Sequence, residues 1–386
     1  MDEQQQHIQL QAISHHPEIT QSAKNKTFLL ISVISILALC ISFVLWITRQ
    51  TAELHTKTNS TGIAFAATDN FVKVCGTQLC LDGKPYRIHG ATGYGQYANP
   101  ANQMALAKQG NINTLEIVEF ENNYHKLSDT MSEATWTKID KYIAEARKND
   151  IHIILNFSSY GKSLQAAGQN PTGDWQPFLS FVANRVNTVT GVTYANDPTI
   201  MMIEFWGEID APQAGIKPGS TGDTATITEF FKRSAAQWRA MDPNHIISSG
   251  GLSYLDLPNA AGIDWKSIMS DPNNQVCDVE INSSGDRNTS VPMISQYCKS
   301  LNKPWFLSAW SSCYKAGGGD LTNQLDRDGM LSHAIDMYAI EKGATPAAIP
   351  AVGSDFWNLG NATNPGTCDL GPQFPEVWNT IKTTTL

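Results

Sequence analysis

The stretch DPTIMMIEFWGEI, residues 197–209, holds the clearest strand pattern in this 386-residue chain. An Asp-Pro pair opens it, a nearly unbroken apolar run extends from Ile200 to Trp206, and a carboxylate, Glu208, follows. A strand that is apolar on both faces is typical of a parallel sheet with helices packed on its two sides. The stretch therefore predicts a buried parallel strand with an acidic group at its carboxyl end.

The same pattern recurs along the rest of the chain. Short apolar runs predict seven further strands, at 86–94, 112–120, 151–157, 245–249, 276–282, 304–308 and 351–357. Amphipathic runs predict helices at 132–150, with a capping box at Thr130 and Glu133, and at 174–189, 223–241, 291–300 and 326–342. Eight strands alternating with helices predict a closed (β/α)8 TIM barrel. An open doubly wound sheet is the alternative, but no GxGxxG motif follows an early strand.

The first 70 residues divide into three segments. Residues 1–26 predict a disordered tail, 27–48 a transmembrane signal anchor, and 49–70 a linker that precedes the barrel at 71–386. The span FLLISVISILALCISFVLWI, residues 28–47, lacks charge and is long enough to cross a hydrocarbon core of roughly 30 Å. A cleaved signal peptide is the rival interpretation. FVKVCGTQLCLDGKPYRI, residues 71–88, predicts a hairpin with a turn at Asp82-Gly83.

Charge and cysteine content restrict the possible partners and compartments. The formal net charge is −9 without any long Lys/Arg run, so nucleic acid is excluded as the expected partner. Six cysteines lie in the large domain, and Cys75 and Cys80 flank a short turn that a disulfide would close. We therefore expect a membrane-anchored monomer whose large domain is extracellular or otherwise non-cytosolic. No pattern typical of a metal ligand set appears, so neither a metal nor an organic cofactor is expected.

Carboxylates and aromatic residues gather at the predicted carboxyl ends of the strands. The carboxylates are Glu116, Glu119, Glu121, Glu204, Glu208, Glu280 and Asp355, and the aromatics are Tyr94, Tyr97, Tyr160, Trp206, Trp310, Tyr314 and Trp357. In TIM barrels this end carries the active site. Sugar rings stack on aromatic faces while carboxylates handle protons, so the combination favours a glycan site. The alternative is that the aromatics simply plug the barrel.

Several motifs resemble the clan-A glycoside hydrolases, especially family 5, the cellulase and β-mannanase group. They are HGATGY, GNINTLEIVEF, YANDPTIMMIEFWGEID, AMDPNHIISSGG, KPWFLSAWSSC and GSDFWN, which together span residue 71 to the C-terminus. The resemblance implies that Glu208 is the general acid/base and that Trp357 is the platform beneath the cleaved sugar. It further implies substrate contacts for Trp206, Trp310, Tyr94 and Asn282, and a β-1,4-linked polysaccharide of the mannan or cellulose type as substrate.

The chain departs from the family pattern at decisive positions. The family's nucleophile falls on Ala309, its strand-two arginine on Glu116, and the asparagine before the acid/base on Gly207. Its His-x-Tyr after strand six has no clean match in VEINSSG, residues 279–285. A methyl group neither attacks an anomeric carbon nor takes a proton, so retaining hydrolysis by the usual pair is not expected.

Four interpretations of these departures remain open. In the first, Glu116 and Glu208 form a rearranged catalytic pair that hydrolyses O-glycosidic bonds with inversion. In the second, the domain is a pseudo-glycosidase that binds glycan at the cell surface. In the third, Ala309 replaces a glutamate of an active enzyme, or the alignment is shifted by one residue. In the fourth, the domain is a structural ectodomain without sugar recognition.

Overall fold

A computed structural model describes residues 70–93, 99–118, 126–207, 209, 221–252, 255, 263–281, 284–311, 324–361 and 369–384. Residues Ala66–Leu386 form one compact unit. The predicted tail, the predicted anchor and almost all of the predicted linker lie outside the described residues. In the part of the chain that is described, no helix has both the length and the apolar character needed to cross a bilayer.

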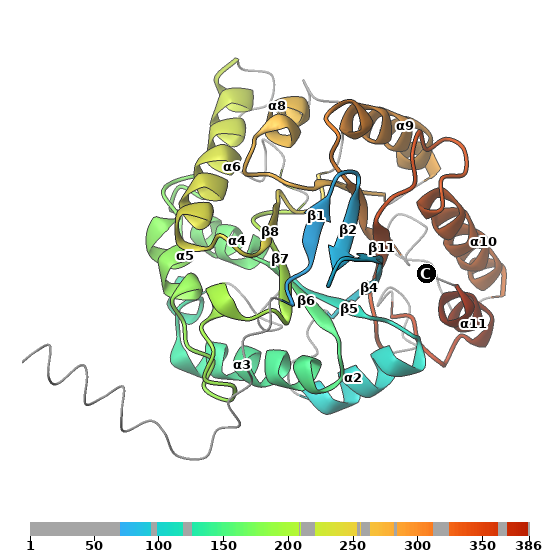
Figure 1. Cartoon of the computed structure of the whole chain (residues 1–386), viewed down its shortest axis with the longest axis horizontal. Helices are drawn as coiled ribbons and strands as arrows, with labels where there is room; N and C mark the ends of the chain where they lie inside the picture. Colours follow the sequence, from blue (N-terminus) through green and yellow to red (C-terminus); the bar gives the residue numbers. More distant parts are fainter. Residues whose placement is uncertain are drawn as a thin grey trace, which may run out of the picture. The chain divides into compact units, whose positions relative to one another are not determined.

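Eight parallel strands form the centre of this unit, with the helices arranged around them (Figure 1). The strands are β4 Ile88–Thr92, β5 Thr114–Ile117, β6 His152–Asn156, β7 Ile200–Glu204, β8 Ile246–Ser248, β9 Cys277–Glu280, β10 Trp305–Ser311 and β11 Gly353–Trp357. Consecutive strands pair in parallel from β4 to β8 and from β9 to β11, and β11 also pairs with β4. The order confirms the predicted (β/α)8 arrangement.

A short contact between the ends of β8 and β9 nearly closes the barrel. Leu252 bridges Val279 in parallel, and the Glu280 amide donates to the Leu252 carbonyl at 3.3 Å. The Gln275 amide also donates to the Ile247 carbonyl at 2.8 Å. The junction between β8 and β9 therefore has fewer backbone hydrogen bonds than the other strand pairs, but these bonds still hold the two strands side by side.

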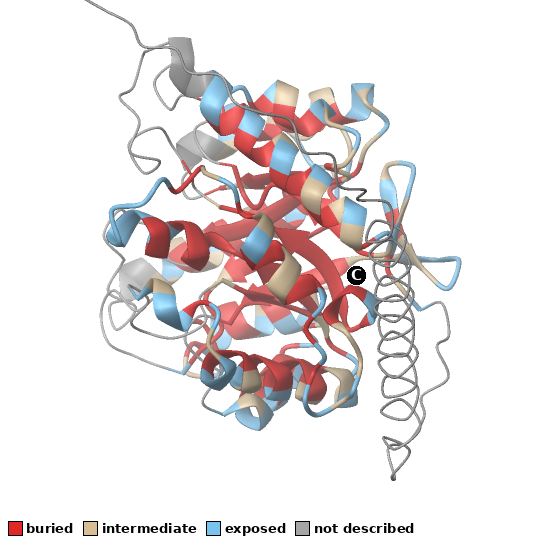
Figure 2. Cartoon of the chain, turned by 90° about the vertical axis from the view of Figure 1, so that its left-hand side faces the viewer, coloured by how far each residue is buried: buried red, intermediate tan, exposed pale blue. Residues whose placement is uncertain are grey.

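Helices follow the strands and turn their apolar faces inward, so buried residues concentrate at the centre in Figure 2. They are α2 Pro100–Gln109, α3 Glu133–Lys148, α4 Ser158–Ala166, α5 Gln176–Ala183, α6 Thr221–Met241, α8 Trp265–Ser270, α9 Ser284–Ser300, α10 Gln324–Glu341 and α11 Pro375–Thr383. In α3, Ile139, Tyr142 and Ile143 recur at helical spacing and are fully buried, as the sequence predicts.

Two details of the predicted helices are wrong. The cap of α3 is Ser132, whose hydroxyl accepts from the Thr135 amide at 3.2 Å, whereas the Thr130 hydroxyl donates to the Leu127 carbonyl at 2.7 Å. A 3-10 turn at 127–129 occupies Thr130 and moves the helix start by two residues. The helix predicted at 174–189 ends at Ala183, because the chain then turns into the Val186–Thr193 bridge.

A small antiparallel sheet lies across the amino-terminal end of the barrel (Figure 1). It consists of β1 Lys73–Cys75, β2 Gln78–Leu81 and β3 Lys84–Tyr86, and Cys75–Cys80 is disulfide-bonded as predicted. Asp82 and Gly83 both have positive φ, 52° and 73°, which is typical of the hairpin turn that the pair predicts. Val72 and Leu79 pack into one apolar cluster with Ile88, Ile154, Met202, Ile246, Val276, Phe306 and Val352. We call the barrel residues of this cluster the lower layer.

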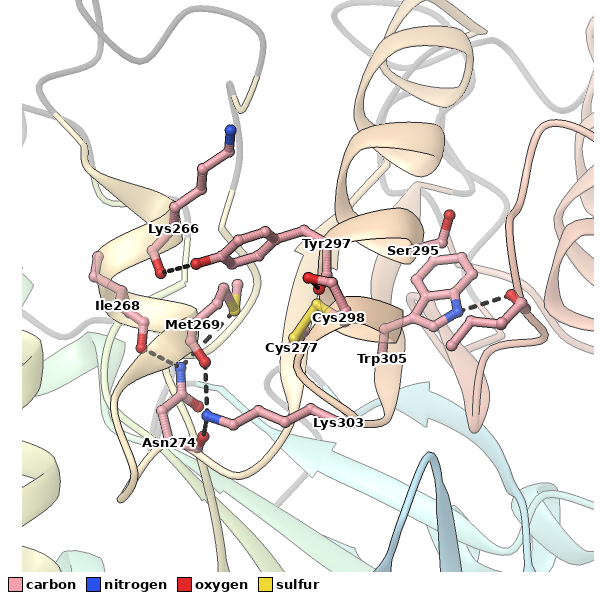
Figure 3. The surroundings of a disulfide bond; sticks show 12 residues. Lys266, Ile268, Met269, Asn274, Cys277, Ser295, Tyr297, Cys298, Lys303 and Trp305 are labelled. Atoms are coloured by element: carbon pink, nitrogen blue, oxygen red, sulfur yellow. Dashed lines mark hydrogen bonds between the residues drawn. A yellow bond between two sulfur atoms is a disulfide. The ribbon is translucent and has the colours of Figure 1, made fainter.

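A second disulfide, Cys277–Cys298, ties β9 to α9 (Figure 3). Beside it the Lys303 ammonium donates to the carbonyls of Met269, Asp271 and Asn274 at 2.6–2.8 Å. Burial lowers the pKa of Lys303. These contacts join the turn after α8 to the start of β10, so the strand that carries Ala309 begins from a fixed position. Cys313 and Cys368 lie outside the described residues.

Candidate active site

The structure describes some of the predicted site residues, and these lie at or near the carboxyl ends of the strands. Glu208, Tyr94 and Asn282 fall outside the described residues. Glu116, Ala309, Trp206, Trp310 and Trp357 fall inside them.

Ala309 lies in β10, where the pairing with β11 shifts register between Leu307 and Trp310. Its φ of 46° is in the left-handed region that alanine rarely adopts. The backbone amide of Ala309 donates to the Asp355 carboxylate of β11. The position that matches the family's nucleophile is therefore a bulge whose methyl group carries no chemistry and whose amide is bound to a neighbouring acid.

Glu116 lies inside the barrel and not on its rim. It is 3% exposed, and its carboxylate accepts from Thr92 Oγ1 at 3.1 Å and from Asn156 Nδ2 at 2.9 Å. The predicted role of Glu116 as the second catalytic carboxyl needs an oxygen that reaches a substrate or a water. The observed position counts against that role, since both oxygens are engaged below the mouth.

Glu116 belongs to a layer of four carboxyls that alternate strands contribute. The others are Glu204 on β7, Asp278 on β9 and Asp355 on β11, each exposed by 1% or less. Asn156 Nδ2 also donates to Glu204 at 3.0 Å, and Ser248 Oγ donates to Asp278 at 2.7 Å. We call these four groups the carboxyl layer. In most TIM barrels, side chains from alternate strands fill such layers with branched apolar groups.

Protons, and not side-chain cations, compensate the carboxyl layer. Within the described residues, the hydrogen-bond partners of these acids are amide, hydroxyl and backbone groups and the other acids of the layer, and the acids are not arranged to hold a metal ion. Burial raises the pKa of Glu116 and of Asp278, and it raises the pKa of Glu204 and of Asp355 strongly, with neighbouring carboxyls adding to the shift in the latter two. Like charges this close do not all ionise, so the layer holds shared protons.

Trp206 and Trp310 are packing residues in this structure. Both are 0% exposed. Trp206 stacks on Trp175 with centroids 6.1 Å apart, and Trp310 contacts Phe356 at 5.7 Å. Gly161 makes room for Trp206, because a Cβ at position 161 would lie 2.3 Å from Cε3 of its ring. These positions indicate that Trp206 and Trp310 fill the barrel and do not stack on a sugar.

Trp357 is the last residue of β11 and is half-buried, beside Ser311 in the parallel ladder. Glu280 ends β9 and is likewise half-buried, in register with Ser308 of β10. An indole face and a carboxylate thus stand at the mouth with part of their surface exposed. Of the described aromatic residues that the sequence predicts to bind sugar, Trp357 has the position that suits this role.

Sequence reasoning missed Asp278 and the role of Asn156. Asp278 is in the middle of an apolar strand, and Asn156 ends another, where its amide joins two acids inside the barrel. One signal for the layer was available. Gly90 on β4 leaves the space that Asp355 fills, because a Cβ at position 90 would lie 2.7 Å from the Asp355 Cβ.

In sequence, the chain is similar to proteins named as mannosidases. A family model described as GH family 5 beta-mannosidase-like matches residues 104–274. Mannan endo-1,4-beta-mannosidase 3 of Arabidopsis thaliana is 26% identical over 389 residues, which cover 83% of this chain and 88% of that protein. Mannan endo-1,4-beta-mannosidase 8 of Oryza sativa is 26% identical over 226 residues, but the match spans 48% of this chain and 59% of the rice protein.

Solved structures agree on the fold. The endo-1,4-beta-mannanase of Rhizomucor miehei aligns with a TM-score of 0.62 at 17% identity, covering 81% of this chain and 99% of that chain. The catalytic domain of an endoglucanase from Thermobifida fusca aligns with a TM-score of 0.53 at 18% identity, covering 81% and 97%. At this level of identity the likeness shows a shared barrel and nothing about substrate.

Proposed function

We propose, from the premise that this chain is a clan-A, family-5-like glycoside hydrolase in sequence and fold, that it binds a β-1,4-linked mannan-type glycan and cleaves it with Glu208 as the general acid. The observation that carries the proposal is the end of β7. Glu208 directly follows Gly207, whose amide donates to Ser158 Oγ at 2.9 Å just beyond the strand. In a TIM barrel this is the end where substrates bind.

The roles follow from the chemistry of O-glycoside cleavage. A carboxylic acid donates a proton to the leaving oxygen, and a flat aromatic face supports the sugar ring whose C1–O bond breaks. Glu208 supplies the acid, and Trp357 at the end of β11 supplies the face. The names of the plant relatives support mannan as the glycan, and the endoglucanase likeness concerns the fold alone.

A second function, glycan binding without cleavage, has its own supporting observation. Ala309 supplies no nucleophile, and Glu116 is enclosed in the carboxyl layer. Binding needs stacking and hydrogen bonds but no second reactive carboxyl. In this alternative the same mouth holds a mannan chain and releases it unchanged.

One experiment separates the two functions. The purified full chain is incubated with β-1,4-mannan and with carboxymethylcellulose, and both reducing-end release and glycan binding are measured beside the Glu208→Gln variant. Hydrolysis is supported if the unmodified chain releases reducing ends and the Glu208→Gln variant does so at least about 100-fold more slowly. Binding without release supports the second function. Neither binding nor release would refute both.

We also propose that residues 27–48 anchor the chain in a membrane with the barrel on the non-cytosolic side. The disulfides Cys75–Cys80 and Cys277–Cys298 support this, because disulfides persist in oxidising compartments. Protease protection of the full chain in sealed membrane vesicles tests the orientation. A barrel digested only after the vesicles are opened agrees with a luminal location, and digestion from the cytosolic side contradicts it.

A further inference from the structure

Glu280 occupies the mouth of the barrel next to the position that lacks a nucleophile. It is the last residue of β9 and lies in register with Ser308, the residue directly before Ala309 on β10. Side chains alternate along a strand, and Asp278 of the same strand faces the barrel interior, where Ser248 binds it. Glu280 therefore faces the same interior, one pleat nearer the mouth.

Glycines let this carboxylate reach across toward β7. A Cβ at Gly251, which has φ of +40°, would lie 2.7 Å from Glu280 Cγ and 3.0 Å from its Oε1. A Cβ at Gly207 would lie 3.4 Å from the same Oε1. The Glu280 carboxylate thus points toward the residue that directly precedes Glu208, with only β8 between β7 and β9 in the barrel wall.

The degree of burial separates Glu280 from the other acids that face the interior. Glu116, Glu204, Asp278 and Asp355 are at most 3% exposed, whereas Glu280 is half-buried. A group that takes a proton from water must reach that water. Among the described acids that point into the barrel, Glu280 has both the direction and the exposed surface that this task needs.

Resting on the proposed hydrolytic function, we propose that Glu280 is the second catalytic carboxyl and acts as a general base. Ala309 is smaller than the family's glutamate, and in this proposal a water takes the place of that nucleophile. Glu280 takes a proton from that water, and the hydroxide oxygen bonds to the anomeric carbon. The C1–O electron pair goes to the leaving oxygen, which takes its proton from Glu208. Water is consumed, and the configuration at C1 inverts.

This role assigns a function to Gly207, where the family has asparagine. The Cβ of an asparagine would lie 3.4 Å from Glu280 Oε1, and the rest of its side chain would compete for the space beside that carboxylate. Inverting sites keep their carboxyls roughly 6.5–9.5 Å apart so that a water fits between acid and sugar. Glycine keeps that space open.

The test compares the full chain with Glu280→Gln, Glu280→Asp and the surface control Glu376→Gln, which lies in the first turn of α11. We expect Glu280→Gln to lose about 10²–10⁴-fold in mannan hydrolysis, with unchanged mannan binding and thermal midpoint. Glu280→Asp should retain part of the rate because it keeps the acid. Glu376→Gln should match the unmodified chain.

Two further readouts identify the role. Proton NMR of the first product should show the α-anomer released from the β-linked substrate. Azide should restore cleavage of an aryl β-mannoside by Glu280→Ala and give the α-glycosyl azide. A Glu280→Gln rate within about threefold of the unmodified chain, or a β-anomer as first product, would overturn the role of Glu280 while hydrolysis stands. Absence of hydrolysis by the unmodified chain would overturn the proposed function, and this inference with it.

Discussion

The two levels of the barrel interior differ in chemistry although the same strands build both. At the lower layer lie Met202 of β7 and Val276, the residue directly before β9; two residues further on, these strands contribute Glu204 and Asp278. The apolar residues of the lower layer pack against the hairpin, and beside them the Tyr86 hydroxyl of the hairpin bonds to Thr114 Oγ1 at 2.9 Å. The carboxyl layer contains acids that share protons. A barrel of this kind thus separates the level that stabilises it from the level that carries titratable groups.

The largest expected effect comes from placing an acid in the wrong layer. Ile154 is 0% exposed in the lower layer, two residues before Asn156. Ile154→Asp loses apolar burial and leaves a carboxylate without donors, so we expect a loss of at least about 4 kcal/mol in the free energy of unfolding. Denaturant unfolding measures it. The control Ile154→Val should lose about 1 kcal/mol. A cost below about 2 kcal/mol for the aspartate would show that the lower layer also accepts acids.

Removing the disulfide between Cys277 of β9 and Cys298 of α9 should have the next largest effect. Cys277 lies between Val276 and Asp278, and its disulfide with Cys298 closes a loop with a sequence separation of 21. Replacing both cysteines by alanine should lower the free energy of unfolding by about 3 kcal/mol, since the unfolded chain gains freedom. The same measurement on the hairpin pair Cys75 and Cys80, whose separation is 5, should give a smaller loss. Equal losses for the two pairs would contradict the loop-length argument.

The carboxyl layer predicts how stability depends on pH. The folded pKa values of its four acids are raised, so their contribution is complete below the unfolded values near 4 and is lost as pH rises through the folded values. Burial lowers the pKa of His89, His152 and His333 to about 4, so these groups favour folding above about pH 6.5 and oppose the acids below it.

Between pH 7 and 9 the pH dependence of stability therefore comes mainly from the four acids. The free energy of unfolding should fall by about 1.4 kcal/mol per pH unit for each proton that the folded layer keeps and the unfolded chain releases. Thermal and denaturant unfolding at several pH values measure the slope. Glu204→Gln removes one of these protons and should flatten the slope while Glu376→Gln leaves it unchanged. A stability that rises from pH 7 to 9 would show that the layer is ionised in the folded state.

The smallest effect concerns the backbone at the mouth. Ala309 has φ of 46°, which glycine adopts without a steric penalty. Ala309→Gly should therefore raise the free energy of unfolding, by less than about 1 kcal/mol. The matched change Ala105→Gly, at an exposed site in α2, should lower it by about 1 kcal/mol. If both changes destabilise equally, the left-handed conformation at position 309 carries no strain.

The arrangement of strands and helices was predictable because the apolar period repeats eight times. The chemistry of the interior was harder to predict. In the sequence a tryptophan at position 206 looks the same whether it lines a cleft or fills the core. Its burial depends on the room that Gly161 leaves for its ring and on the stacking with Trp175. Glu116 was correctly placed at a strand end, but its enclosure depends on hydrogen bonds with Thr92 and Asn156, which lie 24 and 40 residues away. Such long-range contacts leave no periodic trace in a sequence.

The hairpin at the amino-terminal end affects how the buried carboxyls exchange protons with solvent. With Val72 and Leu79 packed against the strands, the hairpin covers the amino-terminal end of the barrel in the part of the chain that is described. The half-buried Glu280 stands one pleat above the carboxyl layer, at the end of the barrel where the inner acids lie closest to solvent. A glycan chain that covers this end of the barrel would separate the protons of the carboxyl layer from the surrounding water. Glycan binding at the mouth would therefore slow proton exchange in the barrel interior.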